Sequence, residues 1–345
     1  MNPLVWSLLI TSLASSTIIT MSSNHWLIAW VGLELNTLSI LPIIMKSKHP
    51  RATEAATKYF IIQATAATLI LFASTTSAWQ TGQWTITNTT SYTTLLTTAA
   101  IMLKMGLAPV HIWYPQILQG TTMYTALTIS TWQKLAPLAL LYMTHNHLNP
   151  TMLLLMGLLS SLIGGWGGLN QTQMRMIMAF SSIAHMGWLV TALAISPNLA
   201  TLTMITYMIM TTTTFIPLAT ANTKTISDMT VTWALSPAML ATMMITLISL
   251  GGLPPTTGFM PKWLIMKDLA TADLHLMATL LLLSSLPNLF FYIRLAYFAL
   301  LTTPPATTTT EHKWRFKPHL PTSTGPLLAT TLLLLPLTAT LHNTT

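Results

Sequence analysis

Four ionisable side chains lie inside stretches of this sequence that are otherwise apolar: Glu34, Lys104, Lys134 and Lys262. A charge at the centre of a membrane-spanning helix costs at least ~2.5–3.5 kcal/mol, so such residues usually face protein or water and have a function. Burial disfavours the charged form of a lysine, and a nearby carboxylate favours it again. A buried lysine whose partner approaches and withdraws can therefore take up and release a proton. The chemistry that these residues predict is proton transfer.

A structural role is the alternative for the Glu34–Lys104 pair and also for two histidines that could take part in proton transfer. A buried pair of Glu34 with Lys104 could serve only to fix helix packing, whereas Lys134 and Lys262 have no second buried acid to neutralise them. His111 and His185 are possible proton relays because histidine titrates near neutrality. For each histidine, a hydrogen-bonded structural role is the alternative.

The stretch GGLPPTTGFMPKW, residues 251–263, predicts an interrupted helix next to Lys262. Pro254 and Pro255 cannot donate backbone hydrogen bonds, which frees the carbonyls of Leu250 and Gly251. Non-helical backbone at membrane depth persists only within protein or beside a water-filled cavity. The stretch is therefore a candidate ion site. The alternative is a helix that ends at Gly252 and is followed by a surface loop.

A second copy of this pattern supports the interrupted helix. GLAPVHIWYP, residues 106–115, matches GLPPTTGFMP, residues 252–261, without gaps, and it places Pro109 in a second interruption near Lys104. Gly/Pro interruptions at corresponding places in two halves of a chain are typical of transporter binding sites. The matched residues are Gly106 with Gly252, Leu107 with Leu253, Pro109 with Pro255, Pro115 with Pro261, and Trp113 with Phe259.

The composition identifies an integral membrane protein. Of 345 residues, 52% are hydrophobic and 6% are charged, and the mean hydropathy is +0.60. Soluble domains carry about 25% charged residues. The net charge of +8 comes from lysine and arginine whose distribution among loops indicates membrane topology. It does not indicate a nucleic-acid-binding surface. Cysteine is absent, which excludes disulfides, thiolate-held iron–sulfur clusters and CxxCH haem attachment.

The elements that must position these residues are about eleven membrane-spanning helices of about 20 residues each. The sequence lacks the features of a cleaved signal peptide, so its first apolar run is expected to be a retained helix. The predicted helices span residues 3–23, 25–45, 54–78, 92–112, 122–143, 149–171, 174–195, 198–220, 237–268 (broken), 273–300 and 323–342.

The charges of the loops predict the orientation. Lysine and arginine gather in the loops after even-numbered helices, which places those loops and the N-terminus on the cytoplasmic or matrix side. Eleven crossings leave the C-terminus on the opposite side, toward the intermembrane space. The basic residues concerned are Lys46, Lys48, Arg51, Arg175, Arg294, Lys313, Arg315 and Lys317.

The two broken helices lie five helices apart, so they cross the membrane in opposite directions. We therefore expect an all-α polytopic fold, a single membrane domain of two inverted five-helix repeats followed by a C-terminal helix. The repeats cover residues 1–147 and 148–301, and the loop and last helix cover residues 302–345. In transporters of this architecture, the site lies near the midplane between the repeats.

Several segments resemble one family closely. SSNHWLIAWVGLELNTLSILP (22–42), KYFIIQATAATLIL (58–71), MRMIMAFSSIAHMGW (174–188) and GGLPPTTGFMPKW are similar to the mitochondrial NADH–ubiquinone oxidoreductase chain 2 family. Its members are antiporter-like subunits of the proton pump of respiratory complex I. The resemblance covers essentially the whole chain, and eleven helices match the shortened animal form of the subunit.

The resemblance implies roles at matching positions. It implies that Glu34 pairs with Lys104, that Lys134 is the central lysine of a hydrophilic axis, and that Lys262 leads toward a neighbouring antiporter-like subunit. It also implies that the chain holds no cofactor of its own, since flavin, iron–sulfur clusters and quinone belong to partner subunits. The expected partners are other complex I membrane subunits and lipids, in the mitochondrial inner membrane.

The predicted function is proton translocation by a subunit of the respiratory-chain NADH:ubiquinone reductase, driven by electron transport in other subunits. Two alternatives belong to other classes. The chain could be a subunit of a monovalent cation/proton antiporter, or a purely structural membrane subunit. Sodium-dependent transport by the isolated chain would favour the first alternative, and lysine variants that disturb assembly but not pumping would favour the second.

Overall fold

The structure is a computed structural model that describes residues 2–302 and 324–333. These residues form helices joined by loops and contain no β-strand; only two isolated bridges occur among them, between His25 and Thr85 and between Gln173 and Thr225. The chain forms two compact units, Met1–Met156 and Gly157–Thr345. Lys313, Arg315, Lys317 and the end of the predicted helix 323–342 lie outside the described residues.

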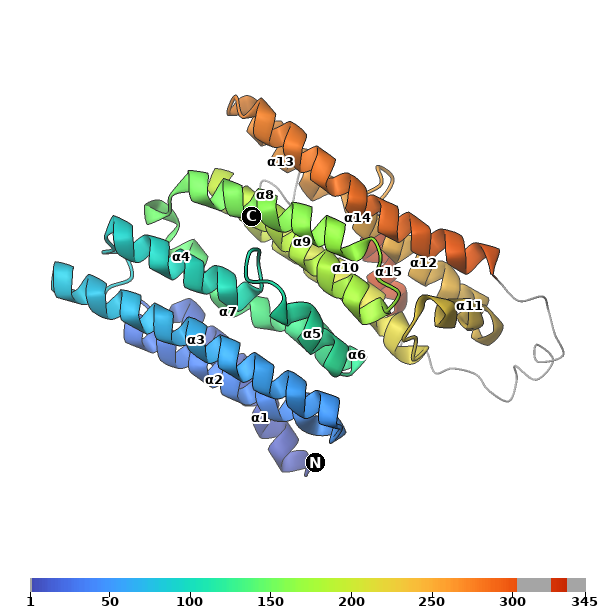
Figure 1. Cartoon of the computed structure of the whole chain (residues 1–345), viewed down its shortest axis with the longest axis horizontal. Coiled ribbons are helices and arrows are strands. Elements are labelled where there is room, and N and C mark those ends of the chain that lie inside the picture. Colours follow the sequence, from blue (N-terminus) through green and yellow to red (C-terminus); the bar gives the residue numbers. More distant parts are fainter. Residues whose placement is uncertain (1, 303–323, 334–345) are drawn as a thin grey trace. The chain divides into compact units, whose positions relative to one another are not determined.

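The first unit begins with long apolar helices and continues with shorter, interrupted ones (Figure 1). Helix α1 packs on α2, α2 packs on α3, and α3 packs on both α4 and α5. Its helices are α1 (Pro3–Ser22), α2 (Trp26–Ile44), α3 (Pro50–Thr81), α4 (Ser91–Met105), α5 (Trp113–Gly120), α6 (Met123–Ser130) and α7 (Leu135–Met143). Short 3-10 turns at Met45–Ser47, Trp132–Lys134 and His145–His147 complete it.

Helix α8 (Pro150–Gly168) crosses the boundary between the units. In the second unit, α10 packs on α9, α12, α13 and α15, and α14 packs on α11, α12 and α13. These helices are α9 (Met174–Ile195), α10 (Pro197–Thr220), α11 (Ile226–Leu235), α12 (Pro237–Gly251), α13 (Phe259–Thr271), α14 (His275–Leu301) and α15 (Thr324–Leu333).

Seven helices among the described residues are long and apolar enough to cross a membrane: α1, α2, α3, α8, α9, α10 and α14. They correspond to seven of the eleven predicted spans. Two more predicted spans are divided into shorter helices, which are α6 with α7 and α12 with α13, and the predicted span 92–112 contains α4 followed by a non-helical stretch. The last predicted span, 323–342, contains α15, and its other residues lie outside the described ones.

Both predicted interruptions are present, and they share the same helix end and the same length, although only the first contains a cis peptide bond, Ala108–Pro109. Helices α4 and α12 each have 15 residues and end at a glycine in the left-handed region, Gly106 with φ of 73° and Gly252 with φ of 82°. The non-helical stretches, 106–112 and 252–258, have equal length, and α5 and α13 then begin at the matched residues Trp113 and Phe259. The gapless sequence match therefore describes one structural motif in two copies.

The prediction of a continuous helix over 122–143 was wrong. Helix α6 ends at Ser130, a 3-10 turn covers Trp132–Lys134, and α7 begins at Leu135. Pro137 explains the interruption, because it has no N–H to bond the carbonyl of Gln133 and its ring crowds that carbonyl. The predicted helix 92–112 likewise ends early, at Met105.

Helix α11 was not predicted, although the sequence carries its start signal. Thr225 and Asp228 form a capping box, the pattern Thr-x-x-Asp that precedes many helices. The backbone N–H groups of Thr225 and Lys224 donate to Oδ2 of Asp228 at 2.8 and 2.9 Å. These donors lower the pKa of Asp228 from its ordinary value because they stabilise the carboxylate.

Replacing Asp228 by alanine is expected to loosen the start of α11 by about 1 kcal/mol, the usual cost of losing a cap. Since the folded-state pKa is lowered, the contribution is complete above the unfolded-state value of about 3.9 and is lost as pH falls through the folded-state value. Amide hydrogen exchange at residues 226–229 measures the effect. Asp228→Asn, which keeps an acceptor oxygen, should retain most of the protection; equal loss in both variants would contradict the capping role.

Candidate functional site

In the first unit, two predicted lysines line the same small buried cavity. Lys104, in the last turn of α4, is 6% exposed, and Lys134, at the end of the 3-10 turn, is 3% exposed. The cavity is completed by Tyr59, Gln63, Met105, Trp113, Tyr114, Ile129 and Gln133. The helix interruptions thus bring two ammonium groups from different elements to one polar cavity inside this unit.

Each lysine of this cavity meets a different environment. The Nζ atom of Lys134 lies 5.0 Å from the centre of the Tyr114 ring, within the range of a cation–π interaction. The Nζ atom of Lys104 is buried without a hydrogen-bond partner among the described residues. An unpaired buried ammonium is costly unless water solvates it or its proton leaves. Lys104 is therefore a candidate for proton exchange with water.

Amide and phenol groups line the cavity and connect its elements. The Tyr59 hydroxyl donates to Oε1 of Gln133 at 3.2 Å, and Nε2 of Gln133 donates to Oδ1 of Asn36 at 3.1 Å. Nε2 of Gln63 donates to the carbonyl oxygen of Lys104 at 3.3 Å. These side chains from α2, α3 and the 3-10 turn hold the segments that carry both lysines.

None of the side chains of this polar network was predicted from the sequence. Tyr59 and Gln63 stand four residues apart in the apolar helix α3 and are both buried. Polar residues at that spacing lie on one face of a helix, and this signal could have identified them.

Glu34 lies partly buried on α2, where the hydroxyl of Thr37 donates to its Oε2 at 3.2 Å. Its carboxylate interacts electrostatically with Lys104. No ion pair within 4.0 Å joins Glu34 to Lys104 in the described part of the chain. The described residues therefore do not show the direct Glu34–Lys104 pair that the family resemblance implies.

In the second unit, Lys262 begins a different arrangement. Its Nζ donates to the carbonyl oxygen of Gly251 at 2.9 Å, one of the two carbonyls that the prolines were predicted to free. The same atom lies 6.0 Å from the centre of the Trp188 ring. The lysine thus caps the C-terminal end of α12, where a cation is favoured by the helix dipole.

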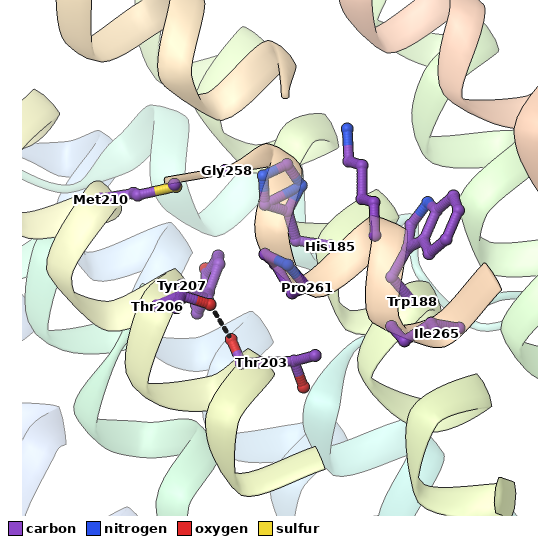
Figure 2. A pocket seen from close by; sticks show the side chains of 10 residues that line it. His185, Trp188, Thr203, Thr206, Tyr207, Met210, Gly258, Pro261 and Ile265 are labelled. Carbon is purple, nitrogen blue, oxygen red and sulfur yellow. Dashed lines mark hydrogen bonds between the residues drawn. The ribbon is translucent and has the colours of Figure 1, made fainter. Parts of the chain in front are cut away.

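Lys262 and His185 line one cavity, between α9, α10 and α13 (Figure 2). The imidazole of His185 lies edge-on to the Tyr207 ring at 5.8 Å. Trp188, Thr203, Thr206, Tyr207, Met210, Gly258, Pro261 and Ile265 complete the lining. The structure therefore brings together the lysine and the histidine that were singled out in this half of the sequence.

The structure places the other predicted site residues within the interruptions themselves. Nδ1 of His111 lies 3.1 Å from the carbonyl oxygen of Pro109, and His111 does not line the cavity of the first unit. Pro109, Pro254 and Pro255 are exposed within the non-helical stretches. The prolines shape the backbone, and His111 makes a local contact within its own loop.

Two glycines permit the geometry around Lys262. A Cβ atom on Gly258 would overlap the carbonyl oxygen of Ser249, so only glycine fits this approach of the loop to α12. A Cβ atom on Gly252 would lie 2.8 Å from Nζ of Lys262.

Replacing Gly252 by alanine is expected to displace the Lys262 ammonium from the Gly251 carbonyl and to cost about 1–2 kcal/mol, because its φ is positive. The rate of amine modification at Lys262, relative to that at Lys267, measures the displacement. Gly82→Ala is the matched control, since Gly82 has φ of 72° and no atom within 4 Å of an added Cβ. If Lys262 is no more reactive in Gly252→Ala than in Gly82→Ala, Gly252 does not position the lysine.

Comparisons with known proteins show to which family the chain belongs. The family model described as NADH:quinone oxidoreductase/Mrp antiporter matches residues 23–287, and the model for the NADH dehydrogenase subunit 2 C-terminus matches residues 289–342. NADH-ubiquinone oxidoreductase chain 2 of Salmo salar is 51% identical over 343 residues, which are 98% of this chain and 97% of that protein. The chain belongs to the NADH–ubiquinone oxidoreductase chain 2 family.

A second relative is similarly close in sequence, and two solved structures share the fold. The Xenopus laevis protein of that name is 50% identical over 323 residues, covering 93% of this chain and 94% of that one. A chain of respiratory complex I from Thermus thermophilus shares the fold, with a TM-score of 0.84 and 24% identity over 97% of this chain and 80% of that chain. A chain of the Mrp complex from Dietzia sp. DQ12-45-1b has a TM-score of 0.82 at 15% identity, covering 97% and 75%.

Proposed function

We propose that this chain translocates protons across the mitochondrial inner membrane as an antiporter-like subunit of NADH:ubiquinone oxidoreductase. The observation that supports this function best is the shared cavity of Lys104 and Lys134 in a chain 2 family member. Two buried ammonium groups on a polar cavity are costly to keep charged together, so protonation of one disfavours protonation of the other. Such a pair can pass protons in sequence.

The energy for this transport comes from outside the chain. Moving one charge against 100 mV costs about 2.3 kcal/mol. The sequence holds no cysteine and no dinucleotide fingerprint, and the described residues contain no cluster of three or more metal-ligating side chains. In this proposal, flavin, iron–sulfur clusters and quinone belong to partner subunits of the complex, and the partners include neighbouring antiporter-like subunits. Their redox chemistry acts on this chain through charge or packing at subunit boundaries.

Each group has a role in this proposal. Glu34 tunes the charge of Lys104 from a distance, Lys104 and Lys134 exchange protons through the cavity, and Lys262 carries protons in the second unit with His185 as a neighbouring relay. The basic residues of the predicted loops support an orientation with the N-terminus toward the matrix and the C-terminus toward the intermembrane space.

Replacing Glu34 by glutamine tests the tuning role. We expect proton transfer through the chain to slow roughly tenfold, the effect of losing about 1.4 kcal/mol of favourable interaction. The measurement is protons pumped per electron in the assembled complex in sealed vesicles. Glu54→Gln is the control, because Glu54 is exposed and pairs with Lys58 on the surface of α3. An unchanged ratio of protons to electrons in Glu34→Gln would exclude Glu34 from the mechanism. Sodium-dependent transport by the isolated chain would instead favour a cation/proton antiporter.

A further inference from the structure

The first unit has an apolar groove that the proposed function does not use. It lies between the end of α2 and the first turns of α3, two helices that pack against each other (Figure 1). Its volume is about 340 Å³, and it shares no lining residue with either lysine cavity. Its lining residues are Leu41, Met45, Ala56, Thr57, Phe60 and Ile61.

The groove exists because two short side chains lie among long ones. Ala56 is buried and Thr57 is small, whereas Met45, Phe60 and Ile61 are large and remain exposed. The hydroxyl of Thr57 donates to the carbonyl oxygen of Glu54 in its own helix, so the threonine offers its methyl group and no free donor. The lining therefore suits a hydrocarbon chain that enters from outside the unit.

Two contacts mark the membrane surface beside this groove. The ammonium of Lys58 lies 2.6 Å from the Glu54 carboxylate, one turn nearer the start of α3. Lysines near the ends of membrane helices extend in this way to keep their charge at the surface. The Nζ atom of Lys46 lies 4.3 Å from the centre of the Trp6 ring, near the start of α1, and tryptophan is enriched at membrane surfaces. The groove therefore lies just below the level of lipid headgroups.

The segment next to the groove is basic. Met45, which lines the groove, immediately precedes it. Glu54 is its only acid and is paired with Lys58, and no ion pair within 4.0 Å joins the exposed Lys48 or Arg51 to an acid in the described part of the chain. The basic residues between positions 46 and 58 are Lys46, Lys48, Arg51 and Lys58.

We propose that this groove binds one anionic phospholipid, with an acyl chain between α2 and α3 and the phosphate against Lys48 and Arg51. Basic segments beside membrane helices attract anionic lipid, and this attraction acts over about 8 Å at physiological salt. A zwitterionic lipid gains less, because its own ammonium offsets its phosphate. An apolar partner helix could cover the groove but would leave the two cations without a counter-charge. The site does not depend on proton transfer by the chain.

Photoreactive lipids test the site in the assembled complex, reconstituted into phosphatidylcholine vesicles. The two probes are phosphatidylglycerol and phosphatidylcholine, each with a diazirine in one acyl chain, and mass spectrometry locates the labelled residues. A basic residue near an anionic surface strengthens binding roughly fivefold. We therefore expect phosphatidylglycerol to label residues 41–61 at least about fivefold more than phosphatidylcholine does.

Two variants and their matched controls separate the headgroup from the acyl chain. The double variant Lys48→Gln with Arg51→Gln should lower phosphatidylglycerol labelling to the level of phosphatidylcholine. Lys224→Gln is its control, since Lys224 is exposed in a loop of the second unit and is predicted to face the same side of the membrane. Thr57→Phe should fill the groove and lower labelling by both probes. Thr65→Phe, exposed on α3 outside the groove, should leave labelling unchanged.

Three results would overturn the inference. Equal labelling of residues 41–61 by the two probes would show only unselective contact with bulk lipid. Unchanged selectivity in the double variant would exclude Lys48 and Arg51 as headgroup ligands. A crosslink from residues 41–61 to a partner subunit, in place of lipid label, would show that the groove is a protein interface. If Thr57→Phe fails to assemble, the double variant still decides, because both of its positions are exposed.

Discussion

Replacing Lys262 by methionine is expected to stop proton transfer through the second unit while the complex still assembles. The ammonium caps the Gly251 carbonyl and lines the cavity of His185. Methionine keeps the length of the side chain but cannot carry a proton. Loss of a proton-transfer group at a reacting site slows the step by on the order of 10²-fold or more, and proton-coupled NADH oxidation measured in sealed vesicles should fall accordingly.

The control for this variant lies on the same helix. Lys267 is exposed on α13 and lines neither lysine cavity described here, so Lys267→Met removes the same charge without touching the site. Full coupled activity in Lys262→Met would exclude the lysine from transport. Failure of assembly in Lys262→Met, but not in Lys267→Met, would instead favour the purely structural subunit.

The second large effect is expected for Lys134→Met. Lys134 is buried beside Tyr114 in the cavity that it shares with Lys104. Removing a charge from membrane depth relieves a cost of at least ~2.5–3.5 kcal/mol, so the variant should assemble at least as well as the wild type while proton translocation falls by on the order of 10²-fold. Native gel analysis and proton uptake on the same preparation separate the two effects.

Lys58→Met is the matched control for Lys134→Met. Lys58 is also a lysine of the first unit, but its ammonium pairs with Glu54 at 2.6 Å on the surface of α3. An exposed pair of this kind is worth at most about 1 kcal/mol, so its loss should leave both assembly and pumping unchanged. Equal effects of the two substitutions would show that lysine burial has no bearing on transport.

Local rules were sufficient to predict the interruptions. Proline and glycine act through their own backbone geometry, so the match of Gly106 with Gly252 predicted two equivalent helix ends. The freed carbonyl of Gly251 was likewise predicted, but not that Lys262 would occupy it. That contact depends on how the 252–258 loop folds back, and Gly258 permits the fold only because it has no side chain.

Other features were missed for two different reasons. Helix α11 carried a readable capping box, and the break before Lys134 followed from Pro137; in both cases the signal was present but outweighed by the apolar pattern. The bonds of Gln133 to Tyr59 and Asn36 could not be predicted, because residues far apart in sequence meet only through the packing of α2, α3 and the 3-10 turn. The same holds for Glu34, whose direct pair with Lys104 is not formed.

The proton-to-electron ratio of the assembled Lys134→Met complex, measured in sealed vesicles, tests most directly whether buried lysines carry protons. With assembly and electron transfer to quinone retained, we expect a ratio clearly below that of the wild type and of Lys58→Met. A ratio equal to that of the wild type would contradict the proposed function.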